Sequence, residues 1–166
     1  MISLRGLYHG IILDHSKEPQ NRRVIADANY KGERHGPLCG DKLTVFLKIK
    51  DGIIKDTAFE GTGCAITVAS SSMMTVALKG RTLVEARCLF DGIYHMITDT
   101  VTAPHPELGL LEVLAGVRQF PARIECAMLA WHALQLALSD QSSKALATHR
   151  FEGQKPQVQQ TSLQVS

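Results

Sequence analysis

Apolar residues recur at two different spacings along the first part of this chain, and each spacing predicts a different element. Near the N-terminus the spacing is that of a helix and the pattern stops before Pro19: Leu4, Leu7, Tyr8, Ile11 and Ile12. Over residues 42–50 apolar and polar residues alternate, which is typical of a half-buried strand. Asp51-Gly52 then predicts a type I′ hairpin turn, after which residues 53–61 return as the partner strand. Residues 21–32 carry a weaker pattern that predicts a third strand.

The remainder of the folded region predicts helices. Their expected ranges are Cys64 to about Leu78, Thr82 to about Thr100, a short segment around Leu110 to Val117, and Pro121 to about Leu138. Gly80 after the first and Pro121 at the start of the last are residues typical of helix ends. A helix, a small sheet and then several helices together predict an α+β fold.

Residues 1–139 are expected to form one globular domain. The chain has 166 residues, of which 45% are hydrophobic, and a chain of this size can bury its own core. From residue 140 to residue 166 Gln and Ser are frequent and the apolar periodicity is lost. We therefore expect residues 140–166 to be a mobile polar tail.

Charge and hydropathy argue against two classes of partner. Lys and Arg number 18 against 16 Asp and Glu, a net charge of +2, and the basic residues form no long stripe. This balance does not favour a nucleic acid or a membrane surface as partner. No run approaches the roughly 20 apolar residues of a membrane helix, and the N-terminus does not resemble a secretory signal, so we expect a cytoplasmic protein.

Four cysteines carry the candidate chemistry: Cys39, Cys64, Cys88 and Cys126. In a reducing compartment such thiols bind metal, react or pack in the core. Cys39 and Asp41 flank Gly40 just before a predicted strand, and residues i and i+2 of an extended segment point to the same side. The two side chains can therefore face one point in space.

Two further cysteines have surroundings that favour a thiolate. Cys64 follows two glycines at a predicted helix start, where backbone N–H groups and the helix dipole favour negative charge. Cys126 lies on the last predicted helix, and Arg123, one turn earlier, can compensate the charge of its sulfur. Three thiolates and the Asp41 carboxylate form a set that Zn²⁺ accepts as a tetrahedron, and sulfur ligands also suit iron–sulfur clusters.

Each of these residues also has a simpler interpretation. Cys126 has apolar neighbours and could pack in the core, Cys64 could be inert, and Asp41 could cap a turn. Cys88 shares a helical stripe with Val84 and His95; a Cys–His pair is one interpretation, but we expect a packed core cysteine outside the site. The chain has no C-x₂-C pair, which argues against zinc fingers and thioredoxin-like motifs.

Four segments taken in order resemble a known family: "LYHGIILDHSKEPQNRR", "GPLCGD", "GTGCAITVASSSMM" and "FPARIECAMLAW". They are similar to the SufU branch of the SufU/IscU family of iron–sulfur cluster assembly proteins, also found as the N-terminal domain of NifU. The resemblance spans Leu7 to about Leu138. It implies a three-stranded antiparallel sheet packed against helices, and a metal site formed by Cys39, Asp41, Cys64 and Cys126.

The resemblance also implies a function and its partners. Members of this branch bind zinc and take persulfide sulfur from a SufS-type cysteine desulfurase. They have also been assigned a scaffold role, in which a transient iron–sulfur cluster passes to downstream assembly proteins. Such a protein is a sulfurtransferase or scaffold that acts with the desulfurase and not a stand-alone enzyme. Within it we expect Cys39, in a Gly-Pro loop, to accept sulfur, and Asp41 to be the ligand that exchanges.

Two departures from the family pattern stand near Cys126. The chain reads "RQFPARI" where the IscU branch has a chaperone-recruiting Leu-Pro-Pro-Val-Lys motif. It also has Glu125 where SufU proteins usually have Lys and IscU proteins have His. Because adjacent helical residues diverge by roughly 100°, we expect Glu125 to point away from the metal.

Two other functions fit the same residues. One is a cysteine-nucleophile hydrolase that uses Cys64 with a histidine and Asp41. The other is a purely structural zinc protein. Measuring the metal content and the stimulation of a desulfurase distinguishes these three functions.

Overall fold

The helices and strands follow the α+β order that the sequence predicts. The structure is a computed structural model that describes residues 4–36, 40–98 and 106–150. Its elements are helix α1 (Leu4–Lys17), strands β1 (Tyr30–His35), β2 (Lys42–Lys50) and β3 (Ile53–Thr62), helices α2 (Ala65–Leu78) and α3 (Leu83–Thr98), the 3₁₀-helix η1 (Pro106–Gln119) and helix α4 (Pro121–Arg150).

The strands form one antiparallel sheet in the order β1-β2-β3. Asp51 and Gly52, which join β2 to β3, have φ angles of 55° and 75°. Positive φ at both central residues is the signature of a type I′ turn. The predicted hairpin is therefore confirmed, and so is the three-stranded antiparallel sheet.

The third strand begins later than the sequence pattern suggests. Residues 21–29 form only one isolated bridge, between Arg22 and Phe59, and β1 starts at Tyr30. The side chain of Asn29 accepts a hydrogen bond from the N–H of Ile49 and donates one to its carbonyl, replacing strand pairing at that point. Ile25 packs with Phe46 and Ala58 in a small cluster of their own.

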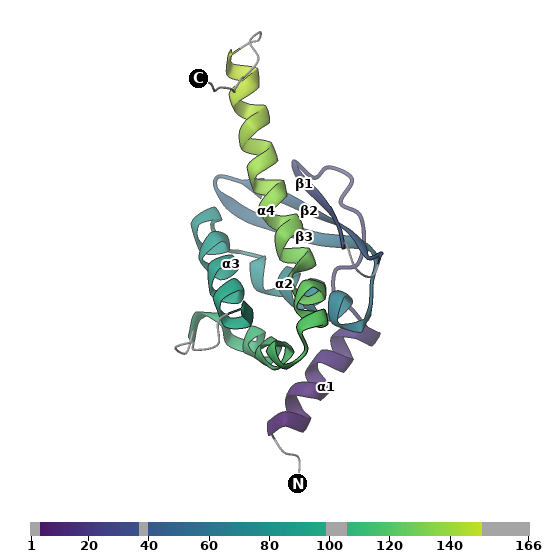
Figure 1. Cartoon of the computed structure of the whole chain (residues 1–166). Coiled ribbons are helices and arrows are strands. Elements are labelled where there is room, and N and C mark those ends of the chain that lie inside the picture. Colours follow the sequence, from purple (N-terminus) through teal and green to yellow (C-terminus); the bar gives the residue numbers. More distant parts are fainter. Residues whose placement is uncertain (1–3, 37–39, 99–105, 151–166) are drawn as a thin grey trace, which may run out of the picture.

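Helix α4 crosses the sheet and forms the centre of the molecule (Figure 1). It packs against β1, β2 and α2, while α1 packs against α2. Trp131 of α4 is fully buried, and its indole N–H donates to Ser70 Oγ at 3.2 Å. Ser70 in turn donates to the carbonyl of Ala127 at 2.7 Å. The small serines of α2 are thus buried, and Ser70 lies at the contact between α2 and α4.

Two predicted helices differ in type or length. The segment around Leu110 to Val117 is part of the longer 3₁₀-helix η1, which is kinked at Gly109. Helix α4 continues to Arg150, well past Leu138, through residues such as Ala145 and Leu146 that favour helix. Residues 151–166 lie outside the described part of the chain, so a mobile tail remains a prediction.

Cys88 is exposed on α3, and its assignment to the core was wrong. The buried residues of α3 lie on the opposite side of the helix from Val84 and Cys88: Ala86, Leu89, Ile93 and Ile97. Val84 is 71% exposed, so the face that carries Cys88 is turned to solvent. No helix in the described ranges combines the length and apolarity that crossing a membrane requires.

We expect Gly32→Ala to destabilise the protein, because α4 contacts the backbone of β1 there. A Cβ at Gly32 would lie 2.1 Å from the carbonyl oxygen of Ala133 and 2.6 Å from the nitrogen of Ala137, both in α4. Because the helix would have to move, the free energy of unfolding should fall by at least about 1–3 kcal/mol, the usual range for overpacking. Urea unfolding followed by Trp131 fluorescence measures the change.

Gly10→Ala on α1 is the matched control. A Cβ at Gly10 meets nothing within 4 Å, and alanine favours helix over glycine by about 1 kcal/mol, so this variant should be no less stable than the unmodified chain. Equal stability of Gly32→Ala and the unmodified chain would contradict the close approach of α4 to β1.

Candidate metal centre

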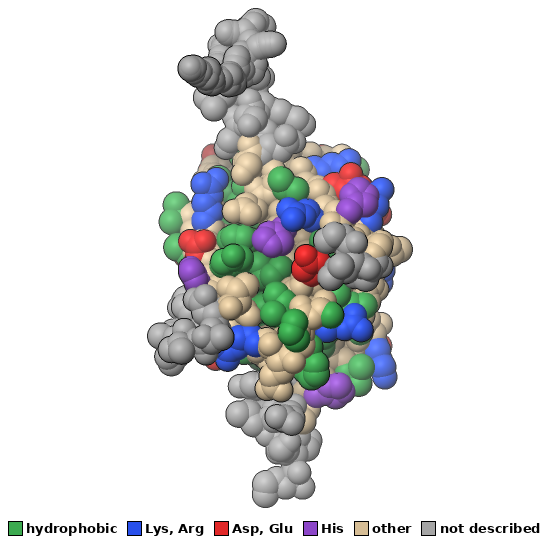
Figure 2. Space-filling model, in the orientation of Figure 1, with side chains coloured by type: hydrophobic (Ala, Val, Ile, Leu, Met, Phe, Trp, Pro, Cys, Tyr) green, Lys and Arg blue, Asp and Glu red, His purple; other side chains and the backbone are tan. Residues whose placement is uncertain are grey.

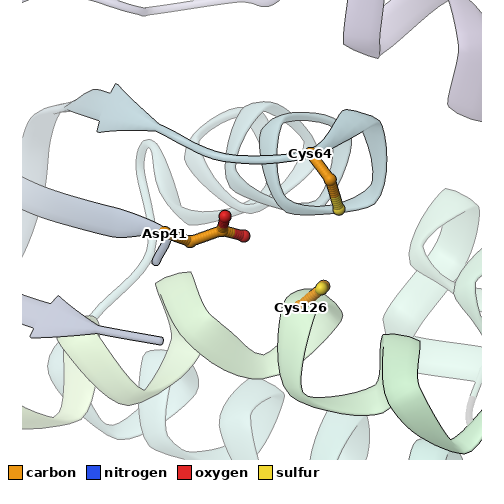
Figure 3. Close-up of side chains that lie close together, drawn as sticks. All are labelled: Asp41, Cys64 and Cys126. Carbon is orange, nitrogen blue, oxygen red and sulfur yellow. The ribbon is translucent and has the colours of Figure 1, made fainter. Parts of the chain in front are cut away.

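Three elements that are distant in sequence bring Asp41, Cys64 and Cys126 together (Figure 3). Asp41 directly precedes β2, Cys64 is the N-cap residue of α2, and Cys126 lies in the second turn of α4. One ligand atom of each residue lies within 4.8 Å of the others. Four residues were predicted to form this site, and the structure brings these three together.

The fourth predicted ligand, Cys39, lies outside the described residues. The argument that placed it beside Asp41 assumed an extended segment, and Gly40 does not have that conformation. Its φ of 69° is in the left-handed region, which favours glycine. Covalent geometry still keeps the Cα atoms of Cys39 and Asp41 within about 7 Å of each other.

The Asp41 side chain is buried, with 5% of its surface exposed. Its Oδ2 accepts a hydrogen bond of 2.6 Å from the hydroxyl of Thr67, in the first turn of α2. Its backbone carbonyl accepts a hydrogen bond of 2.7 Å from the N–H of Gly36. The carboxylate therefore has a fixed position at the start of β2.

The glycines of the "EGTG" segment allow this packing. A Cβ at Gly61 would lie 2.0 Å from the carbonyl oxygen of Lys42, and the φ of Gly61 is 136°. A Cβ at Gly63 would lie 2.6 Å from Cγ2 of Thr67 and 3.1 Å from Oδ2 of Asp41. Only residues without a side chain fit at these two positions.

Cys64 is half-buried and its surroundings favour a thiolate. Burial raises the pKa of its thiol, but the nearby Thr67 hydroxyl and the backbone N–H groups of Thr67 and Ile66 outweigh burial, so the pKa lies below its usual value. The Cys126 thiol contributes in the same direction. These donors belong to the first turn of α2, as expected for a cysteine at a helix N-terminus.

The surroundings of Cys126, by contrast, disfavour its thiolate. Burial, followed by the neighbouring Cys64 sulfur, raises the pKa of Cys126 to about 11, although Arg123 acts to lower it. Without a cation Cys64 is thus the more acidic of the two thiols. A bound divalent ion would favour the ionised form of both.

Arg123 and Glu125 lie beside Cys126 at the surface. Nη1 of Arg123 is 3.9 Å from the Cys126 sulfur, and the two cysteines raise the pKa of Arg123, Cys126 foremost. Glu125 is exposed, as expected for a residue that diverges from Cys126 on the helix, and its carboxylate is not in the group of close ligand atoms. Both residues line a hollow of about 230 Å³ that also contains Asp41 and Cys126.

The donor atoms fit a tetrahedral metal ion. Bonds of about 2.3 Å to sulfur and about 2.0–2.2 Å to oxygen separate the donors of a zinc tetrahedron by about 3.5–3.8 Å. The observed separations, all within 4.8 Å, need only a small contraction to reach that geometry. Two soft sulfurs and one carboxylate are also the donor types that Zn²⁺ accepts.

Sequence reasoning missed Thr67. Its hydroxyl lies 2.6 Å from Asp41 and 3.5 Å from the Cys64 sulfur, so it touches two candidate ligands. The available signal was its position three residues after Cys64, since residues i and i+3 of a helix are neighbours.

Comparison with known proteins gives one consistent result. The NifU-like N terminal domain family matches residues 7–148. The chain is 39% identical over 133 residues to the zinc-dependent sulfurtransferase SufU of Bacillus subtilis, covering 80% of this chain and 90% of that protein. It is 41% identical over 135 residues to the iron–sulfur cluster assembly scaffold protein IscU of Streptococcus pyogenes, covering 81% of this chain and 84% of that protein.

The fold agrees with these sequence matches. A crystal structure of a nitrogen-fixing NifU-like protein (N-terminal) from Brucella abortus superposes with a TM-score of 0.75 at 29% identity, covering 82% of this chain and 95% of that chain. The family model matches the part of the chain that contains Asp41, Cys64 and Cys126. The chain therefore belongs to the family of NifU-like N-terminal domains, which includes SufU and IscU.

Proposed function

We propose that this protein is a metal-binding sulfur acceptor in iron–sulfur cluster assembly that receives persulfide sulfur from a SufS-type cysteine desulfurase. The observation that carries the proposal is the convergence of Asp41, Cys64 and Cys126 within 4.8 Å in a chain of this family. The similarity to a relative named as a zinc-dependent sulfurtransferase supports it. We further propose that it acts in the cytoplasm, where its thiols stay reduced.

The proposed metal is Zn²⁺, held by Cys64, Cys126, Asp41 and Cys39. Bound zinc would keep the thiol ligands ionised and protected from oxidation. Arg123, at 3.9 Å from the Cys126 sulfur, would reduce the negative charge of three thiolates and a carboxylate around one divalent ion. The carboxylate is the hardest of the four ligands and therefore the natural one to exchange.

Cys39 is the proposed acceptor of sulfur. Its thiolate attacks the terminal sulfur of the desulfurase persulfide, so one S–S bond forms on Cys39 as the S–S bond on the desulfurase breaks and its cysteine leaves as a thiolate. The exchange is redox-neutral and needs no other reactant. Cys64 and Cys126 belong to packed helices and suit a holding role better.

Exposed hydrophobic side chains on the surface suit a protein partner. Figure 2 shows hydrophobic side chains gathered near the middle of one face, with charged side chains among and around them. Phe120, which precedes α4, is 60% exposed, and Tyr94 of α3 is 42% exposed. Exposed aromatic side chains are enriched where proteins bind one another.

A scaffold role is the second candidate, and the similarity to a relative named as a scaffold favours it. The same thiolates could carry a transient iron–sulfur cluster as cargo for downstream assembly proteins. A hydrolase is less well supported, because in the described ranges the side-chain partners of the Cys64 sulfur include Thr67 and Cys126 but no histidine. Labile sulfide analysis after anaerobic purification distinguishes cluster cargo from zinc.

We expect one Zn²⁺ per chain in the purified protein, and a loss of affinity of more than about 100-fold in Cys64→Ser or Cys126→Ser, since each removes a ligand itself and not only a hydrogen bond to a ligand. Cys88→Ser is the matched control and should keep its metal, because Cys88 is exposed on α3. Elemental analysis and chelator competition measure both quantities. Equal metal loss in Cys88→Ser would show that the cysteines were assigned incorrectly.

We expect Cys39→Ala to abolish sulfur acceptance, because the proposed nucleophile is missing, even where some metal remains bound. Mass spectrometry of the chain after reaction with desulfurase and cysteine detects the added sulfur. An adduct on Cys64 in the unmodified protein would contradict the proposed acceptor.

We expect Asp41→Ala to slow sulfur or cluster transfer while lengthening the lifetime of a bound cluster, because the most exchangeable ligand is gone. The transfer rate and the decay of cluster absorbance give the two readouts. Faster cluster loss in Asp41→Ala would count against an exchange role for this carboxylate.

A further inference from the structure

We propose that Thr67 is a positioning residue of the metal centre, which holds the Asp41 carboxylate through its hydroxyl and so determines how Asp41 binds and releases the metal. This inference rests on the proposed function, since it concerns the same site. Nothing in the sequence motif assigns a role to Thr67, and its geometry is what suggests one.

The Thr67 hydroxyl is placed between two candidate ligands. The residue is fully buried in the first turn of α2. Its Oγ1 lies 2.6 Å from Oδ2 of Asp41 and 3.5 Å from the sulfur of Cys64. The shorter contact has the length of a strong, charge-assisted hydrogen bond from a hydroxyl to a carboxylate.

A hydroxyl has one proton to donate, and the distances indicate that Asp41 receives it. One lone pair of Oδ2 is then occupied, whereas this bond leaves both lone pairs of Oδ1 available, so Oδ1 is the more accessible oxygen for a cation. Thr67 thus favours binding through a single oxygen. A carboxylate bound through one oxygen has fewer metal contacts to break when it exchanges.

The same bond has a second consequence when Asp41 leaves the metal. Only 5% of the side chain is exposed, and a buried carboxylate without partners is costly. The Thr67 hydroxyl gives the released carboxylate a partner within the protein, so Asp41 can detach without moving into solvent. The ligand therefore stays in place to bind again.

Gly63, the residue before Cys64, leaves room for the contact between Thr67 and Asp41. A Cβ at Gly63 would lie 2.6 Å from Cγ2 and 2.7 Å from Cβ of Thr67. These separations are far below van der Waals contact, so any side chain at position 63 would displace Thr67. The glycine before Cys64 thereby preserves the bond between Thr67 and Asp41.

Thr57 offers a comparison within the same chain. It is also a fully buried threonine, in β3, but its hydroxyl has no hydrogen-bond partner in the part of the chain that the structure describes. The two residues share size and burial and differ in what the hydroxyl contacts. Thr57→Val is therefore the matched control for Thr67→Val.

The test measures metal binding by the full chain with Zn²⁺ in chelator competition and with Co²⁺ as a spectroscopic probe. Thr67→Val should weaken Zn²⁺ binding about 10–100-fold, the usual range for loss of a hydrogen bond to a metal ligand, and should shift the Co²⁺ d–d absorption bands. Thr67→Ser keeps the hydroxyl and should retain the affinity and the spectrum. Thr57→Val should leave both unchanged.

A double variant tests whether Thr67 acts through Asp41. In the Asp41→Ala background, Thr67→Val should cause no further loss of Zn²⁺ affinity, because the carboxylate that it positions is absent. An equal loss in both backgrounds, or a Thr67→Ser variant as weak as Thr67→Val, would overturn the inference.

Two further outcomes are distinguishable. Unchanged affinity and Co²⁺ spectrum in Thr67→Val would refute the role of Thr67 and leave the proposed function standing. An unmodified protein that binds neither ion would refute the proposed function itself, and the inference with it.

Discussion

The contact between α4 and the sheet is the constraint on which the metal centre depends. Asp41 belongs to the start of β2 and Cys126 to α4, so their distance is set by how closely the helix approaches the strands. Gly32 permits that approach, because any Cβ there would overlap the backbone of α4. The fully buried Trp131, five residues after Cys126, fixes the helix in the core. A small change in this packing would separate the ligands.

Concentrated negative charge is the second physical constraint. Asp41 and Cys126 are almost fully buried and Cys64 is half-buried, so once both thiols are ionised three anionic groups lie where little water reaches them. The nearby Arg123 is at the surface and can offset only part of this charge. A divalent cation would offset the remainder, and since the unfolded chain has no such site, its binding would also stabilise the fold.

The sequence predicts most strongly what depends on neighbouring residues. Alternation over residues 42–50 and the Asp51-Gly52 turn are local signals, and the hairpin is confirmed. The start of β1 was misjudged because Asn29 satisfies the backbone of Ile49 across the sheet, a contact that no local pattern shows. Cys88 was misplaced because α3 turns the stripe that contains Val84 to solvent and buries its opposite side.

The candidate site shows the same difference between what local sequence predicts and what depends on distant contacts. Motifs identified the candidate ligands by residue type, but the role of Thr67 depends on a hydrogen bond to a residue 26 positions away. The structure also separates two kinds of ligand. Cys64 and Cys126 lie on helices whose displacement would open the core, whereas Asp41 belongs to the connection between β1 and β2 that the Gly36 N–H closes. In the proposed function, exchange of Asp41 therefore leaves the thiolates of Cys64 and Cys126 in place on the metal and requires no repacking of the helices.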